Sequence, residues 1–357
     1  MEKKLTIKDI AKKAGVSVST VSRVLNNHQS VKPEKRALIQ KIIDEEHFQP
    51  SMFARGMINN QSKNIAIVVP DISNPYFSDL IINIDNASRK LGYSVLLFNT
   101  STAGNSNPEN PVQIEEDTFQ TILEKKVDGT ILLGGEIDRV QPNQHYLDNL
   151  NLLNSKIPVV IVGQPVENSN ATFIVRPIEE HAKMALQHLL ALGHHKIGFI
   201  GGEPGIRITE DRLKVFKEHL ELYSTVNPDW IVLNDFYGID GYNAMTKILA
   251  LDTLPDAIVA MNDKVAMGAI RALNDNGLEC PKDIAIVSCD SFKDSEFYSP
   301  RITSIQQDNL ILGQKTVDTL ISTIEDPSSQ RHSIPADYPS IIIRESCGIK
   351  LKKAQAK

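Results

Sequence analysis

The sequence predicts a small all-α helix-turn-helix head followed by an α/β body of two doubly wound lobes with parallel sheets. Its 357 residues are enough for two or three folded units. Near the start, two short helical patterns are joined by a glycine turn. From residue 64, short apolar runs alternate with amphipathic stretches in two sets. Such alternation is typical of parallel sheets covered by helices, which is why an α/β body is expected.

The composition is that of an ordinary folded protein, with 41% hydrophobic and 23% charged residues. The cysteines Cys280, Cys289 and Cys347 follow no metal-ligand or CxxC spacing, which favours reduced thiols in a cytoplasm. The N-terminus lacks the apolar segment of a signal peptide, and no apolar run approaches the roughly 18 residues of a membrane span. We therefore expect a cytoplasmic protein without membrane contact, metal or cofactor.

Charge is divided unevenly along the chain. Residues 1–60 contain 11 Lys and Arg against 6 Asp and Glu, a net charge of +5, and the remaining residues carry 27 basic and 38 acidic side chains, a net charge of −11. A cationic head on an anionic body indicates that the head meets a polyanion. A small excess of lysine at a terminus is the less informative alternative.

The first helix is expected to begin after Thr6, which is placed to cap it, with Asp9 completing a capping box. An apolar stripe follows at helical spacing: Ile7, Ile10, Ala11 and Ala14. Gly15 then ends the helix, because glycine can adopt the left-handed conformation of a tight turn. Ser17 is placed to cap a second helix.

The second helix divides its side chains between two faces. The inward face consists of Val21, Val24 and Leu25, and the outward face consists of Val18, Ser19, Ser22 and Arg23. Two short helices joined by a glycine turn form the helix-turn-helix pattern, whose second helix lies in the DNA major groove. An amphipathic hairpin inside a larger core is the alternative, but it leaves the short donors and the single arginine of the outward face unexplained.

The polar side chains of the head suit two kinds of DNA contact. Phosphate contacts are expected from Thr6, Ser17, Thr20, Ser22 and Asn26. Arg23 can bond guanine with two hydrogen bonds, and Val18 can pack on a thymine methyl. The candidate base readers are therefore Val18, Ser19 and Arg23.

A third helix is predicted over residues 31–48, where Pro33 suits the first turn. It carries two apolar pairs at helical spacing, Leu38 with Ile42 and Ile39 with Ile43. Residues 49–64, QPSMFARGMINNQSKN, follow as a linker. Because the linker contains a glycine and ends in polar residues, a helix there is marginal in isolation.

The stretches TIKDIAKKAGVSVSTVSRVLN (6–26) and PSMFARGM (50–57) resemble the DNA-binding head and hinge of the lactose-repressor (LacI/GalR) family of bacterial transcription regulators. The similarity runs through nearly the whole chain. In that family the hinge becomes helical in the dimer on operator DNA, and a leucine of each chain is wedged into the minor groove. Met57 stands at that position and is apolar and long enough for the same role. The resemblance also implies DNA contacts for the neighbouring hinge residues Ser51, Ala54 and Arg55.

Short apolar runs predict two series of buried parallel strands in the body. The first series is NIAIVVP (64–70), GYSVLLFN (92–99), DGTILLGG (128–135) and IPVVIVG (157–163), and the second is HKIGFIGG (195–202), WIVLND (230–235), AIVAMND (257–263) and DIAIVSCD (283–290). A ligand crevice is expected at the carboxyl ends of the strands. The resemblance implies a type I periplasmic-binding-protein fold whose chain crosses between the lobes near residues 175, 306 and 338.

These patterns divide the chain into a head, a hinge, two lobes and a tail. The limits are 1–46 for the head, 47–62 for the hinge linker, 63–174 with 307–337 for the N-terminal lobe, 175–306 with 338–350 for the C-terminal lobe, and 351–357 for the tail. The tail lacks leucine heptads, so we expect a homodimer that matches a palindromic operator. Residues 99–120, rich in Ser, Asn, Pro and Gly, predict an enlarged loop.

Polar and aromatic residues near the strand ends are expected to line the crevice. The carboxylates and amide are Asp71, Asn262 or Asp263, and Asp290, with Arg212 in a following helix and the rings of Tyr76, Phe77 and Phe236. Such a set suits a sugar, because polar groups bond its hydroxyls and rings stack on its apolar face. The resemblance implies that Arg212, Phe236, Asn262, Asp290 and Gln307 line an effector pocket. The alternative role of an aspartate at a strand end is to cap the next helix, as expected for Asp263.

Two features bear on the effector. Many family members have an Asp-Asn pair after the strand that enters the second lobe, whereas this chain has Arg176 and Pro177. An arginine there could pair with an acidic ligand or sit at the lobe junction. PVVIVGQP (158–165) and ITEDRLKVF (208–216) are most similar to the maltose or α-glucoside regulators of the family, which points to an oligosaccharide. A phosphorylated sugar and a purine stay open as alternatives.

Two other classes of protein fit less well. A nucleotide-dependent α/β enzyme would need a phosphate motif, but GFIGGEPG (198–205) lacks the GxGxxG order, and no P-loop, GxSxG or HExxH occurs. A cytoplasmic sugar-binding protein would share the body but would not need the head. The sequence thus predicts a transcription regulator, a repressor and not an enzyme, that binds double-stranded operator DNA under control of a small sugar-like effector.

Overall fold

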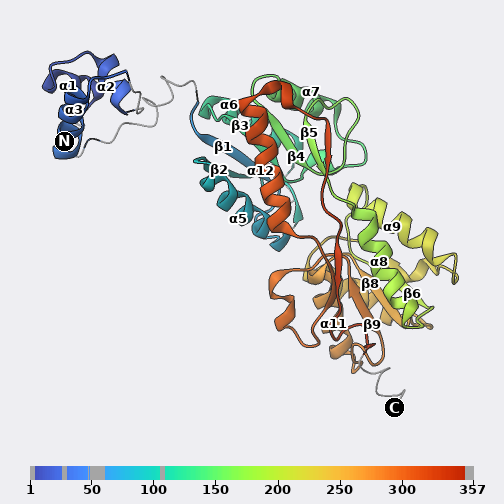
Figure 1. The fold of residues 1–357 in the computed structure, drawn as a ribbon. Helices are drawn as coiled ribbons and strands as arrows, with labels where there is room; N and C mark the ends of the chain where they lie inside the picture. Colours follow the sequence, from blue (N-terminus) through green and yellow to red (C-terminus); the bar gives the residue numbers. More distant parts are fainter. Residues whose placement is uncertain (1–4, 26–29, 47, 49–60, 105–108, 350–357) are drawn as a thin grey trace. The chain divides into compact units, whose positions relative to one another are not determined.

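The computed structural model describes residues 5–25, 30–46, 48, 61–104 and 109–349. The chain forms two compact units, residues 1–64 and residues 65–357, drawn in Figure 1. The first unit contains the head and the second is the body. Several residues expected to contact DNA lie outside the described residues: Asn26, Ser51, Ala54, Arg55 and Met57.

The head consists of three helices around a small apolar core. They are α1 (Ile7–Lys13), α2 (Val18–Leu25) and α3 (Pro33–Glu45). The predicted capping box is confirmed, because the Asp9 carboxylate accepts hydrogen bonds from the backbone N–H and the hydroxyl of Thr6, at 2.9 and 2.6 Å. Gly15 has φ +63°, so glycine suits this turn. The core is formed by Ile10, Ala11, Ala14, Val21, Val24, Val31, Ile39, Ile43 and Phe48.

One expectation about the head was wrong, and one of the two apolar pairs of α3 is not fully buried. Ser22, expected on the outward face, is only 8% exposed. Helix α2 packs against both α1 and α3. Its buried face therefore includes the small side chain of Ser22 in addition to the aliphatic residues. Leu38, which was paired with Ile42, is 47% exposed. Helix α3 buries Ile39 and Ile43 instead.

The N-terminal lobe of the body contains a six-stranded sheet in the order β11-β5-β4-β3-β1-β2. Its strands are β1 (Asn64–Val69), β2 (Ser94–Asn99), β3 (Gly129–Leu132), β4 (Val159–Val162), β5 (Thr172–Val175) and β11 (Ser333–Pro335). The pairs β1–β3, β3–β4, β4–β5 and β5–β11 are parallel. The helices of this lobe are α5 (Pro75–Lys90), α6 (Pro111–Lys125), α7 (Gln144–Asn154) and α12 (Asn309–Glu325). One apolar cluster lies under α5 and α12, and another lies under α6 and α7.

The C-terminal lobe contains the second six-stranded sheet, in the order β12-β10-β9-β8-β6-β7. Its strands are β6 (Ile197–Ile200), β7 (Ile231–Val232), β8 (Ala257–Ala260), β9 (Ala285–Ser288), β10 (Thr303–Gln306) and β12 (Ser340–Ile342). Only β12, which pairs with β10, runs antiparallel among the pairs of this sheet that the structure describes. Its helices are α8 (Ile178–Ala191), α9 (Arg207–Leu220), α10 (Gly238–Leu249) and α11 (Asp263–Asp275). The predicted fold class, a helical head with a two-lobed α/β body, is confirmed.

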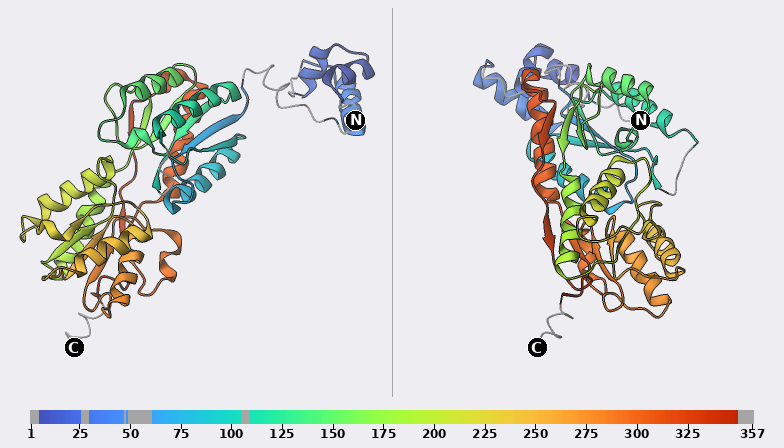
Figure 2. Two further views of the ribbon diagram at one scale, coloured as in Figure 1. Left: turned by 180° about the vertical axis from the view of Figure 1, so that it is seen from behind. Right: turned by 90° about the vertical axis from the view of Figure 1, so that its right-hand side faces the viewer.

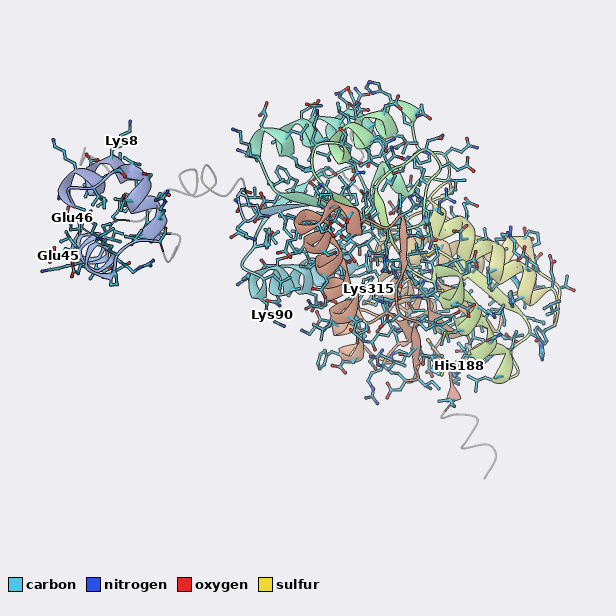
Figure 3. All side chains as sticks on the ribbon, turned by 45° about the horizontal axis from the view of Figure 1, so that its top comes forward. Lys8, Glu45, Glu46, Lys90, His188 and Lys315 are labelled. Atoms are coloured by element: carbon cyan, nitrogen blue, oxygen red, sulfur yellow. The ribbon has the colours of Figure 1, made fainter. Side chains whose placement is uncertain are left out.

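The chain passes between the two sheets three times: between β5 and α8, between β10 and α12, and between β11 and β12. Figure 2 shows the late part of the chain, coloured red, running along both lobes of the body. Lys315 of α12, labelled in Figure 3, donates a hydrogen bond to the carbonyl of Pro335 at 3.2 Å and pairs with Asp337 at 2.5 Å. These contacts hold the last crossing against α12.

Other expectations about the body were wrong in part. Strands β2 and β7 lie at sheet edges, and β2 is only partly buried. The predicted enlarged loop over residues 99–120 is shorter, because α6 begins at Pro111. Short 3₁₀ helices also occur: η2 (Glu136–Asp138), η3 (Pro228–Trp230), η4 (Lys293–Phe297) and η5 (Pro327–Ser329). Within the described ranges, no helix combines the length and apolarity needed to cross a membrane.

Candidate functional site

The outward surface of α2 carries the side chains expected to read DNA bases. Val18 is 41% exposed, and Ser19 and Arg23 are exposed as well. The Ser17 hydroxyl shares hydrogen bonds with the hydroxyls of Ser19 at 2.8 Å and Thr20 at 2.9 Å, and it accepts the Thr20 N–H at 3.3 Å. Three hydroxyls therefore gather at the N-terminus of α2, where the helix dipole favours an anion such as phosphate.

Basic side chains lie on α1. Lys8 and Lys12 are exposed, whereas Lys13 pairs with Glu46 at 2.7 Å. Figure 3 places Lys8 apart from Glu45 and Glu46, which mark the acidic end of α3. Lys8 and Lys12 are therefore exposed basic side chains that a polyanion can reach.

The body has a cavity of about 150 Å³ between its two lobes. The rings of Tyr76 and Phe77 reach it from α5, and those of Phe236 and Tyr237 reach it from the segment before α10. The charged residues of its wall are Glu115, Glu136, Asp138, Arg139, Arg176, Glu203, Arg207, Asp235 and Asp290. A concave space lined by aromatic rings and oriented polar groups is the usual form of a small-molecule site.

Direct contacts between the lobes close this cavity. The hydroxyl of Tyr237 donates a hydrogen bond to the Asp71 carboxylate at 2.5 Å. Nearby, Arg207 donates to the carbonyl of Val140 at 3.2 Å, and the Val140 N–H donates to the carbonyl of Gly205 at 3.0 Å. Each bond joins a residue of the N-terminal lobe to one of the C-terminal lobe, so the body is in a closed arrangement.

Asp290, at the end of β9, is the centre of a buried ionic network. Its carboxylate lies 2.7 Å from Nη1 of Arg212, and Arg176 and His181 each approach it within 3.2 Å. Burial acts to raise the pKa of Asp290, but the Arg212 guanidinium, the His181 hydrogen bond and Arg176 outweigh it and hold that pKa well below its usual range. Burial also lowers the pKa of His181. Asp290 is therefore a permanent anion shared by two arginines.

The part of the cavity wall that the N-terminal lobe supplies is acidic and tightly packed. The Glu115 carboxylate accepts the hydroxyl of Thr102 at 2.8 Å and the N–H of Glu136 at 3.2 Å. A Cβ at Gly135, where φ is +103°, would stand 2.4 Å from that carboxylate, so only glycine allows this approach. Burial raises the pKa of Glu115 to about 7 and that of Asp138 to about 6. Both groups carry a proton for part of the time near neutral pH and can then donate hydrogen bonds.

Most of the predicted effector residues line this cavity: Tyr76, Phe77, Phe236, Asn262 and Asp290. The others are outside its described lining. Arg212 is fully buried behind Asp290, Asp71 bonds Tyr237, and Gln307 donates to the carbonyl of Asp337 at 3.1 Å. Arg212 thus supports the ionic network of Asp290, Asp71 joins the two lobes, and Gln307 connects two of the segments that cross between them.

The cap of α11 is Asn262 and not Asp263, so that expectation was wrong. The Asn262 side-chain oxygen accepts the N–H of Val265 at 3.0 Å. Asp263 is the first residue of the helix, and its carboxylate accepts the N–H of Phe292 at 2.9 Å and the hydroxyl of Ser304 at 2.7 Å. Asn262 thus caps a helix and faces the cavity at the same time.

Sequence reasoning missed several residues of the wall. Glu115 belongs to α6, where the sequence predicts a loop, and Asp138 belongs to the short helix η2. Tyr237 directly follows Phe236, the ring that was selected. Arg207, in the first turn of α9, lies within five residues of Arg212, which was also selected. Within the described ranges, no group of three or more His, Cys, Asp and Glu could hold a metal ion.

Head and body together define a class of protein, the DNA-binding regulator whose helix-turn-helix is joined to a two-lobed ligand-binding body. The family profile described as "Bacterial regulatory proteins, lacI family" matches residues 6–51. A second profile, "Periplasmic binding protein-like domain", matches residues 186–347. The chain belongs to the lacI family of bacterial regulatory proteins. It is a DNA-binding transcription regulator under effector control, and not an enzyme.

Relatives of this chain are repressors. The HTH-type transcriptional repressor PurR of Pasteurella multocida (strain Pm70) is 34% identical over 349 residues, 97% of this chain and 99% of that protein. PurR of Haemophilus influenzae (strain PittEE) is 33% identical, over 96% of this chain and 98% of that protein. The lac repressor dimer bound to operator and the anti-inducer ONPF has the same fold, with a TM-score of 0.84, 24% identity and coverage of 97% and 99%. A CelR–cellobiose complex aligns with a TM-score of 0.68, 23% identity and coverage of 96% and 99%.

The likeness to maltose or α-glucoside regulators gains no support from these relatives, which are named PurR. The two stretches that suggested it contribute to the core and to the cavity. Residues 158–165 contain the buried strand β4, and residues 208–216 belong to α9, whose buried side chains pack in the C-terminal core. Val162, Gly163, Gln164 and Ile208 line the cavity.

Proposed function

We propose that this repressor responds to a small planar base of the purine class, bound in the cavity between the lobes. The observation that carries the proposal is a cavity of about 150 Å³ between the lobes, bordered by the rings of Tyr76, Phe77 and Phe236. A cavity of roughly 150 Å³ holds an aromatic molecule such as benzene, so a flat base is much nearer to its size than an oligosaccharide. The name PurR of the relatives points in the same direction.

The polar groups of the wall suit the edges of such a base. A purine alternates hydrogen-bond donors and acceptors in the plane of its rings, so it needs both kinds of partner. Asp290 is an acceptor at all ordinary pH values, Arg176 is a donor, and Glu115 and Asp138 can act as either because burial raises their pKa. The rings of Phe77 and Phe236 supply the apolar faces against which the base stacks.

Calorimetric titration with purine bases, and with maltose and cellobiose, tests this proposal. We expect a purine base to bind, and we expect Phe236→Ala to weaken that binding by at least about tenfold because a stacking ring is lost. Phe297→Ala is the matched control, since Phe297 is strongly exposed on η4. Binding of a disaccharide in place of every purine would overturn the proposal.

For operator DNA, we propose that Val18, Ser19 and Arg23 contact base edges and that Thr6, Ser17 and Thr20 contact phosphates. All of them are exposed on the head except Thr20, which is partly buried, and this supports these roles. Ser22 is left out because it is buried. The remaining proposed contacts are Asn26, Ser51, Ala54, Arg55 and Met57.

We further propose a cytoplasmic homodimer with a head at residues 1–46 and a hinge at 47–62. The proposed lobes are 63–174 with 307–337 and 175–306 with 338–350, and sheet membership supports this division. Two symmetric heads match the two halves of a palindromic operator. Light scattering during gel filtration checks the dimer, and the mass of a single chain would contradict it.

A further inference from the structure

Arg176 connects the two lobes at the first crossing of the chain. It lies between β5 and α8 and is only 5% exposed. Its Nη2 stands 3.2 Å from Oδ1 of Asp290 in the C-terminal lobe. Its guanidinium carbon lies 4.6 Å from the ring centroid of Tyr76 in the N-terminal lobe. A planar group held by a carboxylate at one end and by a ring against its face has a fixed orientation.

One donor of this fixed group is left without a partner. The Nε of Arg176 is buried and makes no hydrogen bond to any described residue, and Arg176 belongs to the cavity wall. A buried N–H without an acceptor is unfavourable, and such groups in native proteins call for a partner beyond the chain. The donor is therefore available to a ligand atom in the cavity.

We infer that the Nε–H of Arg176 bonds an acceptor atom of the effector, an oxo or carboxylate oxygen, and so decides which effectors the cavity accepts. The inference rests on the proposed function, because it takes the cavity to be the effector site. An amino group in the same place would bring two hydrogen-bond donors together, so neither the Nε–H nor the amino group would have an acceptor. Because Arg176 contacts both lobes, an effector bonded to it also ties the closed lobes together.

Arg207 is the competing residue. Its Nε is likewise buried without a partner among the described residues, and it also belongs to the cavity wall. Its Nη2 donates to the carbonyl of Val140. Arg207 is only partly buried, so water reaches its guanidinium, whereas Arg176 is enclosed and held on two sides. An enclosed donor discriminates more strongly, because water cannot replace a missing acceptor.

Hypoxanthine and adenine form a matched pair of probes, because they share the purine ring and present donor and acceptor in opposite order along one edge. Calorimetric titration of the full-length protein with each base compares wild type with Arg176→Lys, Arg207→Lys and Arg271→Lys. Lysine keeps the positive charge beside Asp290 but lacks the planar fork of arginine. Arg271 is the surface control, since it is exposed on α11 and pairs with Asp275 at 2.9 Å. Thermal unfolding checks that each variant is folded.

We expect wild type to bind hypoxanthine at least about tenfold more tightly than adenine. Arg176→Lys should bring the ratio of the two dissociation constants close to one, while Arg207→Lys and Arg271→Lys keep the wild-type ratio. If Arg176→Lys does not fold, Arg176→Gln takes its place with the same expected result.

Three results would overturn the inference and leave the purine proposal standing: equal affinity of wild type for the two bases, an unchanged ratio in a folded Arg176 variant, or a ratio that collapses only in Arg207→Lys. Failure of wild type to bind either base would overturn the purine proposal and this inference together.

Discussion

Asp290 and Arg212 form a doubly hydrogen-bonded ion pair inside the C-terminal lobe, with Oδ2 to Nη1 at 2.7 Å and Oδ1 to Nη2 at 3.0 Å. Arg212 also donates to the carbonyl of Met261 at 3.0 Å, so the pair links the ends of β8 and β9. Arg176 shares the same carboxylate. The ion pair thus supports the wall on which the proposed effector rests, and its loss has consequences for both stability and binding.

Asp290→Asn should destabilise the protein strongly. The change leaves the buried guanidinium of Arg212 without its counter-charge, which costs about 3–5 kcal/mol for a buried pair. Urea unfolding of the full-length protein measures the loss in the free energy of unfolding. Asp318→Asn, at an exposed position of α12, is the control. A loss below about 1 kcal/mol for Asp290→Asn would show that Arg212 does not depend on this carboxylate.

Glu115 should make the stability of the body depend on pH. Burial raises its pKa from 4.5 to about 7. Because the folded-state pKa is the higher one, the native state holds the proton more tightly, and the stabilisation from this group is full below pH 4.5 and is lost as the pH rises through about 7.

Glu115→Gln keeps a neutral side chain at every pH and should remove that loss. The stability of the variant relative to wild type should therefore increase by roughly 3 kcal/mol between about pH 4.5 and pH 8. Urea unfolding at both pH values measures the difference, with Glu124→Gln, at an exposed position of the same helix, as the control. Parallel pH profiles for Glu115→Gln and wild type would contradict the raised pKa.

Tyr237→Phe should open the cavity. The variant keeps the ring at the cavity wall but loses the hydrogen bond to Asp71 that joins the lobes. Because Tyr237 is partly exposed, we expect a loss of about 1 kcal/mol, or roughly fivefold in effector affinity. Calorimetric titration with the effector base measures the change, and Tyr338→Phe, at a strongly exposed position, is the control. Equal affinities for Tyr237→Phe and wild type would mean that this bond does not contribute to closure.

Arg23→Ala should change which DNA sequences are bound. An arginine that bonds guanine with two hydrogen bonds contributes roughly 1–3 kcal/mol of discrimination at that base pair, so its removal should relax the preference there. Lys8→Ala is the comparison, because an exposed lysine near phosphates should weaken binding to all sequences alike. Binding assays on operator duplexes with single base changes separate the two patterns. Uniform weakening by Arg23→Ala would remove Arg23 from base reading.

The sequence predicted the helical head and the two-lobed α/β body well because both depend on local patterns. Thr6 and Asp9 form their capping box within three residues, and the buried strands of the body have continuous apolar runs. The edge positions of β2 and β7 were not predictable in the same way. Their apolar runs resemble those of central strands, and strand order is set by pairing between distant segments.

The cavity was predicted only in part, because local patterns reveal some of its residues and distant contacts determine the others. Tyr76, Phe77 and Asp290 were found because they follow strand ends, where α/β folds place ligands. Glu115 was missed because the Pro, Asn and Gly residues before it indicated a loop, while α6 starts at Pro111. The role of Arg176 stayed open, because only the folded chain shows that Asp290 and Tyr76 meet it from different lobes.

The central claim is that a purine base bound in the body controls how the head binds operator DNA. Fluorescence anisotropy tests it most directly, with a labelled operator duplex selected from random sequence by the full-length protein. The account predicts that a saturating purine base changes the dissociation constant for this duplex by at least about tenfold, while maltose leaves it unchanged. An operator affinity that stays the same with and without every purine base would contradict the account.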